Sequence, residues 1–84
     1  MSAPKTADYF LDITGQVCPL TFVRTKLRVE RMAPGETLEV RLNPGEPLEN
    51  VPRSLAELGH EICGPEPEIP GDIRGAHRLW VRKR

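Results

Sequence analysis

The pattern of hydrophobic and polar positions along the chain predicts four strands. Residues 7–13 form a short apolar run with aromatic and β-branched members, and Thr14-Gly15 follows it, as expected where a strand ends in a turn. Residues 37–42 alternate between apolar and polar, which is the period of a half-buried strand. A third strand begins at residues 61–63 and a last strand covers residues 77–81, with a stretch rich in Pro and Gly between them.

Helical periodicity predicts a first helix over about residues 19–32. Pro19 suits its first turn, where the missing N–H would have no partner, and Ala33-Pro34-Gly35 ends it. Apolar side chains recur at i, i+3 and i+7, and two more widen the stripe. We expect this stripe to pack on the core: Leu20, Val23, Leu27, Phe22 and Val29.

A second, shorter helix is expected over about residues 51–58. Asn50 is a candidate N-cap, Pro52 falls in the first turn, and Gly59 ends the helix. The apolar residues of this segment predict a face toward the core: Val51, Leu55 and Leu58.

The resulting order, β-α-β-α-β-β, predicts an α/β (α+β) fold. We expect a two-layer sandwich in which two helices cover one face of a four-stranded mixed sheet. Strands separated by a helix should be parallel and joined by right-handed crossovers, whereas the last two strands should form a hairpin. Residues 1–6 are expected to be a flexible tail and residues 7–84 a single domain.

Length and charge narrow the classes of function. A chain of 84 residues buries only roughly 60–65% of its unfolded surface, so we expect surface chemistry rather than an enclosed active site. The net charge is zero, which argues against direct nucleic-acid binding, and the basic residues 82–84 are expected to be a solvated tail. No segment is apolar enough to span a membrane, and residues 1–8 contain no signal-peptide core, so we expect a cytoplasmic protein.

Two cysteines, Cys18 and Cys63, do not make a disulfide framework, and neither belongs to a CxxC pair. Together with the distant His60 and His77 they do not have the spacing of a zinc site, so neither a metal nor a cofactor is expected. Cys63 is expected to be a buried or edge thiol. Both histidines are expected to have structural roles.

Cys18 stands between the first predicted strand and a helix that begins at Pro19. The free N–H groups of the first helical turn and the helix dipole favour a thiolate, which would lower the pKa of Cys18. The same environment would stabilise a persulfide anion. Free cysteines are nevertheless often buried and inert, so from the residues alone both a reactive and a structural Cys18 remain open.

The chain as a whole resembles the TusA/SirA family of small sulfur-carrier proteins, from about Asp12 to Arg82. The resemblance rests on an ordered set of motifs: Asp12-x-x-Gly15-x-x-Cys18-Pro19, Lys26-Leu27, Met32-x-Pro34-Gly35-Glu36-x-Leu38, Val51-Pro52 and Gly59-His60-Glu61. It implies the β-α-β-α-β-β fold. It also implies that Cys18 takes a sulfane sulfur from a donor persulfide and hands it to an acceptor protein.

The implied partners are a protein donor, of the cysteine desulfurase or rhodanese type, and a protein acceptor. Family members serve tRNA thiolation, sulfur oxidation and molybdenum-cofactor supply. Around Cys18 we expect supporting residues in the turn and the helix start, Asp12, Gly15, Pro19 and Thr21, and two docking candidates on the helix, Arg24 and Lys26. The protein is expected to be a monomer.

The chain departs from the family's pattern where partners would be recognised. Thr21 replaces the second proline of Cys-Pro-x-Pro, Asn43-Pro44-Gly45 replaces an acidic Asp-Asp-Pro, and the last hairpin is long and rich in proline. Two alternative functions therefore stay open. One is an interaction or regulatory module without chemistry. The other is a redox sensor using Cys18 and Cys63, which needs their Cα atoms within about 7 Å.

Overall fold

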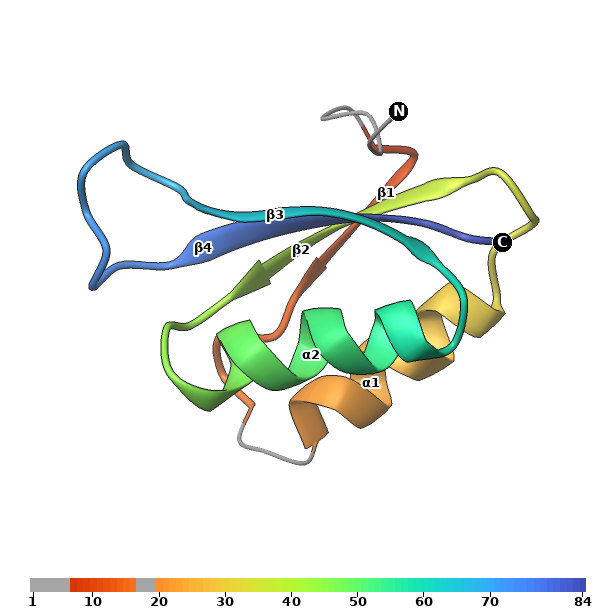
Figure 1. Ribbon diagram of the computed structural model, residues 1–84, viewed down its shortest axis with the longest axis horizontal. Helices are drawn as coiled ribbons and strands as arrows, with labels where there is room; N and C mark the ends of the chain where they lie inside the picture. Colours follow the sequence, from red (N-terminus) through yellow and green to blue (C-terminus); the bar gives the residue numbers. More distant parts are fainter. Residues whose placement is uncertain (1–6, 17–19) are drawn as a thin grey trace.

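The computed structural model describes residues 7–16 and 20–84, in which both helices lie on one face of a mixed sheet (Figure 1). In chain order the elements are β1 (Tyr9–Asp12), α1 (Leu20–Glu30), β2 (Thr37–Leu42), α2 (Glu46–Glu57), β3 (Glu61–Pro67) and β4 (His77–Arg82). The predicted α/β two-layer sandwich and its element order are confirmed.

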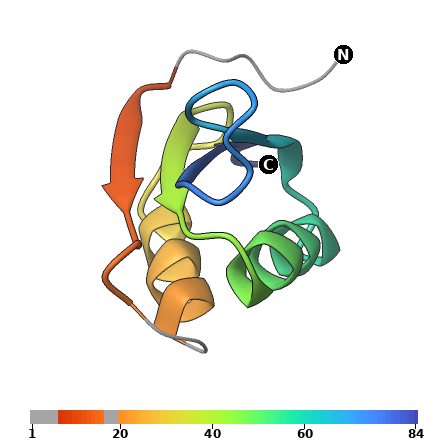
Figure 2. The same cartoon turned by 90° about the vertical axis from the view of Figure 1, so that its left-hand side faces the viewer.

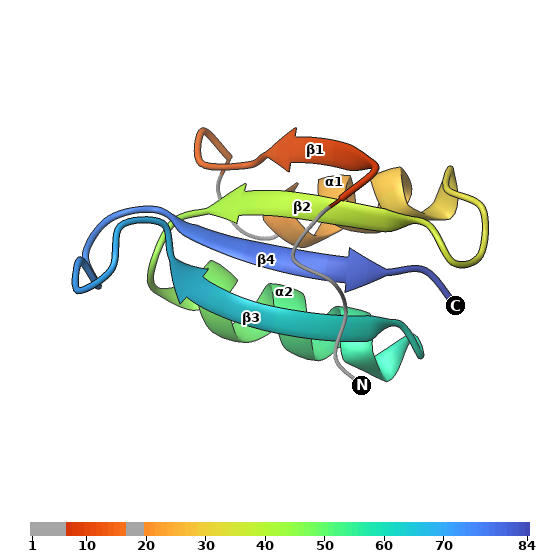
Figure 3. The same cartoon turned by 90° about the horizontal axis from the view of Figure 1, so that it is seen from above.

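The strand order across the sheet is β1-β2-β4-β3, as the view onto the sheet shows (Figure 3). The β1–β2 pair is parallel, whereas β4 is antiparallel to both of its neighbours. The carboxyl ends of β1, β2 and β3 therefore lie at one end of the sheet. Helix α1 is the next element after β1, and α2 is the next element after β2. Both helices therefore also begin at this end of the sheet (Figure 2).

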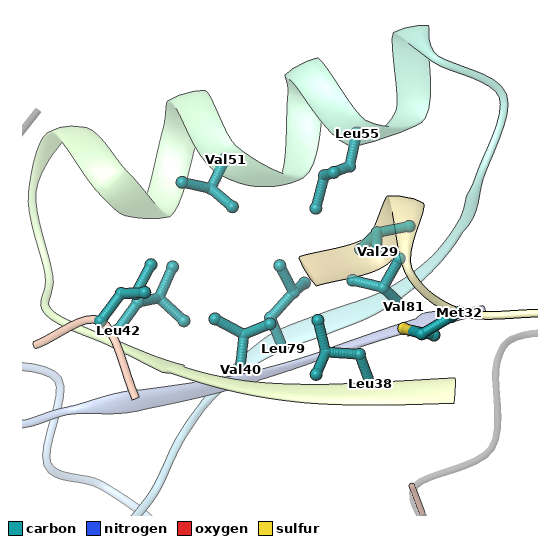
Figure 4. Close-up of a cluster of buried hydrophobic side chains, with 10 residues drawn as sticks. Val29, Met32, Leu38, Val40, Leu42, Val51, Leu55, Leu79 and Val81 are labelled. Atoms are coloured by element: carbon teal, nitrogen blue, oxygen red, sulfur yellow. The ribbon is translucent and has the colours of Figure 1, made fainter. Parts of the chain in front are cut away.

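The core fills the space between the sheet and the two helices (Figure 4). Alternate residues of β2 and β4 face the helices, as the period-2 pattern of residues 37–42 predicts. None of the ten side chains in this cluster exposes more than 3% of its surface: Ile13, Val29, Met32, Leu38, Val40, Leu42, Val51, Leu55, Leu79 and Val81.

Helix α1 buries only part of the predicted stripe. Val29 is buried and Phe22 is half-buried against the core, whereas Leu20, Val23 and Leu27 are on the solvent side. The buried residues of the helix are Thr21, Thr25 and Val29. Spacing at i, i+4 and i+8 places the buried three on one face. Threonine is tolerated there because the Thr25 hydroxyl donates a hydrogen bond to the Thr21 carbonyl at 2.8 Å, within the helix itself.

Helix α2 begins five residues earlier than predicted, at Glu46 rather than Val51. Its N-cap is Gly45, with φ at 102°, and not Asn50, which lies inside the helix. Pro47 takes the first-turn position that the sequence analysis assigned to Pro52.

The expected end of α2 at Gly59 is confirmed. The Gly59 N–H donates to the Ala56 carbonyl and the His60 N–H donates to the Leu55 carbonyl, which is a Schellman motif. Gly59 has φ at 95°, a conformation that glycine adopts without a steric penalty.

Strand β3 continues to Pro67, beyond the expected residues 61–63. It is an edge strand, where prolines are tolerated because one side of the backbone has no strand to bond. The register against β4 shifts between Cys63 and Glu66, around Gly64 and Pro65. The expected β3–β4 hairpin is confirmed.

The face of the sheet that the helices leave open carries an ion-pair network. Glu68 accepts hydrogen bonds from Arg41 at 2.8 Å and Arg78 at 2.7 Å through the same oxygen. Arg41 also pairs with Asp12 at 3.3 Å, and Arg78 pairs with Glu39. These charges join β1, β2, β4 and the residue after β3 on one surface.

Candidate functional site at the connection between β1 and α1

Cys18 and Pro19, the centre of the expected site, lie outside the described residues. The chain is described as far as Gln16 and again from Leu20, the first residue of α1. The connection leaves β1 at the end of the sheet where both helices begin (Figure 2). The surroundings of the site can therefore be built from the residues on either side of it.

Asp12 organises the turn that follows β1. One oxygen of its carboxylate accepts hydrogen bonds from the Thr14 backbone N–H at 2.9 Å and the Thr14 hydroxyl at 2.6 Å. The other oxygen pairs with Arg41. The Thr14 hydrogen bonds, reinforced by Arg41, lower the pKa of Asp12 below its ordinary value, so the side chain is an anion at neutral pH.

Gly15 follows this turn without the backbone conformation that requires glycine. Its φ is not positive, and a Cβ added to it would meet no described atom within 4 Å. Other residues fit this backbone, so the conformation at position 15 does not itself require glycine.

Asn43 reaches the same turn from the end of β2, a role that the sequence analysis missed. Its side-chain amide donates a 2.7 Å hydrogen bond to the Thr14 carbonyl. Parallel pairing of β1 with β2 brings their carboxyl ends together. The signal for this contact was therefore present in the predicted parallel topology, in the residue that follows the second strand.

The start of α1 divides into a buried and an exposed side. Thr21 is 1% exposed, so it lies on the buried side of the helix, whereas Leu20 is 48% exposed. The first turn of α1 contains no acidic residue, whereas that of α2 contains Glu46 and Glu49. The positive end of the α1 dipole thus has no carboxylate of its own turn beside it.

The two docking candidates on α1 face solvent and lie apart from the Asp12 turn. Arg24 is exposed, and Lys26 forms a 4.0 Å ion pair with Glu30 one turn further along the helix. An exposed i, i+4 pair of this kind contributes little to stability.

Cys63 lies in β3, at the opposite edge of the sheet from β1. It is half-buried and pairs in register with Trp80, whose indole N–H donates to Glu39 at 3.1 Å. Strand spacing of about 4.8 Å separates β3 from β1 by roughly 14 Å across the sheet. This position gives no support to Cys63 as a resolving partner for the β1–α1 connection.

Both histidines have structural surroundings. The His60 ring accepts a hydrogen bond from the Arg84 N–H at 3.2 Å, and burial, followed by the charge of Lys83, lowers the pKa of His60. His77 is buried at the start of β4, with its Nδ1 atom 2.9 Å from the Gly75 carbonyl oxygen. Neither ring lies in the turn formed by Asp12 and Thr14.

The described residues contain neither an enclosed pocket nor a group of three or more His, Cys, Asp or Glu side chains placed to hold a metal ion. None of the helices described is long and apolar enough to cross a membrane. Among the described residues, the candidate site is therefore the turn formed by Asp12 and Thr14 after β1, together with the beginning of α1.

Comparison with known proteins gives consistent matches over most of the chain. A family model described as "Sulfurtransferase TusA" matches residues 9–83. The "Sulfur carrier protein TusA" of Pseudomonas entomophila is 30% identical over 77 residues, which cover 92% of this chain and 90% of that protein. A protein of Archaeoglobus fulgidus named "Putative sulfur carrier protein" is 45% identical over 60 residues, or 71% of this chain and 68% of that one.

A solved structure agrees at the level of the fold. The crystal structure of a SirA-like protein from Desulfitobacterium hafniense superposes with a TM-score of 0.70 at 20% sequence identity. The match covers 88% of this chain and 95% of that chain. The two-layer arrangement of four strands and two helices is therefore one already seen in a protein of this type.

Proposed function

The chain belongs to the TusA sulfurtransferase family, whose members act as sulfur carriers, and from this premise we propose that Cys18 is the residue that carries the sulfur. In this proposal Cys18 accepts a sulfane sulfur from a donor protein as a persulfide and relays it to an acceptor protein. The observation that carries the proposal is the place of Cys18 in the sequence, two residues before a helix whose first turn has no acidic side chain.

The chemistry requires no further group from this chain. The Cys18 thiolate attacks the terminal sulfur of the donor's persulfide, a new S–S bond forms at Cys18, and the donor's S–S bond breaks with its electron pair going to the donor thiolate. The terminal sulfur keeps its proton or negative charge, so the step is redox-neutral. In the second transfer the acceptor attacks the terminal sulfur of the Cys18 persulfide, and the S–S bond breaks with its electron pair going to the Cys18 thiolate. The helix dipole favours the anion before and after transfer.

The supporting residues have distinct proposed roles. Asp12 fixes the turn after β1 through Thr14, and the buried Thr21 anchors the first turn of α1 in the interior of the fold. Pro19 and Gly15 complete the connection between them. Because Asp12 is an anion bound to Arg41 and Thr14, it shapes the turn rather than exchanging protons with substrate.

The proposed donor is a cysteine desulfurase or a rhodanese-type protein. The proposed acceptor belongs to tRNA thiolation, sulfur oxidation or cofactor sulfuration. We place this exchange in the cytoplasm, with the protein acting as a monomer. The described residues enclose no pocket, which suits such a carrier because the partner's persulfide has to reach the thiol and leave again.

Mass spectrometry of the intact protein tests the proposal. After incubation with a persulfide-loaded rhodanese-type protein or a persulfide-loaded cysteine desulfurase, we expect a mass increase of about 32 Da, one sulfur atom, that disappears on reduction. The Cys18→Ser variant should lack this increase, whereas the matched Cys63→Ser variant should keep it. Loading of Cys63 instead of Cys18, or no loading by either class of donor, would refute the proposal.

A further inference from the structure

Helix α1 exposes a row of large aliphatic side chains that the fold does not cover. Leu20, Val23 and Leu27 are 48%, 41% and 53% exposed, and they follow one another along the solvent side of the helix. The same helix buries two threonines, Thr21 and Thr25. Its most apolar face is therefore turned outward, which is unusual for a helix packed on a sheet.

Basic side chains accompany this row, which we call the α1 stripe (Leu20, Val23 and Leu27). Arg24 lies within the stripe's span, and Arg31 follows the end of the helix; both are exposed. Within the described part of the chain, no ion pair involves either arginine. Arg28 lies over the Tyr9 ring at 4.3 Å, so its charge is held beside the same helix.

The other charged surface of the protein has a different character. On the open face of the sheet each arginine is matched by carboxylates, as in the Glu68 pairs with Arg41 and Arg78. Around the α1 stripe the one carboxylate of the helix, Glu30, is engaged by Lys26. An apolar row beside unmatched positive charge is complementary to an apolar surface with acidic side chains around it.

The position of the α1 stripe connects it with sulfur transfer. Leu20 follows Cys18 by two residues, and two residues of extended chain span at most about 7 Å. A folded protein that brings a persulfide to Cys18 must therefore cover the beginning of α1. A small molecule carrying the same sulfur has no such requirement.

From these observations we propose that the α1 stripe and the adjoining Arg24 and Arg31 dock the protein that donates sulfur, through an apolar patch with acidic side chains around it. This inference rests on the proposed carrier function. It adds a surface that decides which donor is accepted, separate from the thiol that performs the exchange.

Two donors separate docking from chemistry. Loading of Cys18 is followed by mass spectrometry, with a persulfide-loaded rhodanese-type protein in one series and glutathione persulfide in the other. For Val23→Gln/Leu27→Gln we expect loading from the protein donor to slow by roughly tenfold or more, with unchanged loading from glutathione persulfide. Glutamine retains helix propensity, so the helix should persist, and circular dichroism checks this.

The charges are tested with a second variant that leaves the apolar row intact. Arg24→Glu/Arg31→Glu should also slow loading from the protein donor alone, and added salt should narrow its difference from the native protein. The matched control Arg53→Glu/Arg74→Glu changes the net charge equally at exposed positions elsewhere. Phe10→Gln, 52% exposed on the open face of the sheet, is the control for the apolar variant. Both controls should load at the native rate.

The outcomes distinguish a failure of the docking inference from a failure of the proposed carrier function. If the protein donor loads both α1 variants at the rate of the native protein, the docking inference is overturned and the carrier function stays intact. Slower loading from both donors would also overturn it, since the substitutions would then act on the thiol. If glutathione persulfide loads the native protein and the rhodanese-type protein does not, docking of this donor is refuted. If neither donor loads it, function and inference fail together.

Discussion

The turn after β1 depends on the hydrogen-bonding direction of individual side chains. The Asp12 carboxylate accepts a hydrogen bond from the Thr14 N–H, and the Asn43 side-chain amide donates one to the Thr14 carbonyl. An amide and a carboxylate have nearly the same shape, but only the amide donates. Exchanging one for the other at Asn43 therefore tests a single hydrogen bond between the end of β2 and the turn that leads to Cys18.

We predict that Asn43→Asp lowers the free energy of unfolding by about 1 kcal/mol, because the carboxylate cannot donate to the Thr14 carbonyl and repels it. Denaturant titration measures the change. Asn50→Asp is the matched control. Asn50 accepts a hydrogen bond from Arg53, so a carboxylate preserves that interaction and the stability should be unchanged. Equal effects of the two substitutions would show that the Asn43 contact contributes nothing specific.

The contacts of this turn also show how far sequence reasoning reaches at single residues. Asp12 was assigned to the turn from its place before Thr14 and Gly15, because such a role depends on local chain geometry. Asn43 was not found, because its partner lies 29 residues away and the contact depends on how β1 and β2 align. Gly15 lies in the turn without the positive φ that would require glycine, so the residue type alone does not define the conformation there.

At the scale of elements, the two helices show which signals in a sequence are ambiguous. In α1 the exposed Leu20, Val23 and Leu27 have helical spacing, and so do the buried Thr21, Thr25 and Val29. Hydropathy correctly favours Val29 but also favours the three exposed residues over the two buried threonines. In α2 two prolines, Pro47 and Pro52, each suit a first turn, so the start was placed at the wrong one. The end of α2 was predicted correctly, because the position after the helix has a positive φ, which few residues other than glycine adopt readily.

A pair of identical substitutions in α1 tests which face of the helix is buried. Val29 is fully buried in the core, whereas Val23 is 41% exposed. We predict that Val29→Ala lowers the free energy of unfolding by about 2 kcal/mol through lost burial and an incompletely filled cavity. Val23→Ala should change it by less than about 0.5 kcal/mol, since alanine's helix propensity offsets the small loss of burial.

Chemical denaturation of both variants at one pH is sufficient for this comparison. The substitutions remove the same atoms from the same helix, so differences in the unfolded state largely cancel. A larger loss at Val23 than at Val29 would mean that α1 buries the side that carries Leu20, Val23 and Leu27. In that case the α1 stripe would not be exposed.

Across the whole molecule, the two faces of the sheet are stabilised by different interactions. The helices cover one face with aliphatic packing, whereas the open face has Glu68 bonded to Arg41 and Arg78 from two neighbouring strands. Hydrogen bonds from Arg41 and then Arg78 lower the pKa of Glu68 below its ordinary value. The open face should therefore make the stability of the fold depend on pH in the acid range.

The direction of this dependence follows from the lowered pKa. Between its folded and ordinary pKa, Glu68 is ionised in the folded chain and largely protonated in the unfolded chain, so acidification favours unfolding. The contribution of Glu68 is complete above its ordinary pKa and disappears as the pH falls through the folded one. We predict that Glu68→Gln is less stable than the native protein at pH 7, and that the difference shrinks steadily as the pH is lowered below 4.

Thermal unfolding of the native protein and the variant across the acid range measures this convergence. The control is Glu57→Gln on α2, which removes an exposed carboxylate that makes no ion pair with any described residue. Asp12 also has a lowered pKa, so the native protein and Glu68→Gln should both lose stability in acid. Only their difference reports on Glu68. A difference that stays constant from pH 7 to pH 3 would show that the two arginines do not favour the ionised form of Glu68 in the folded chain.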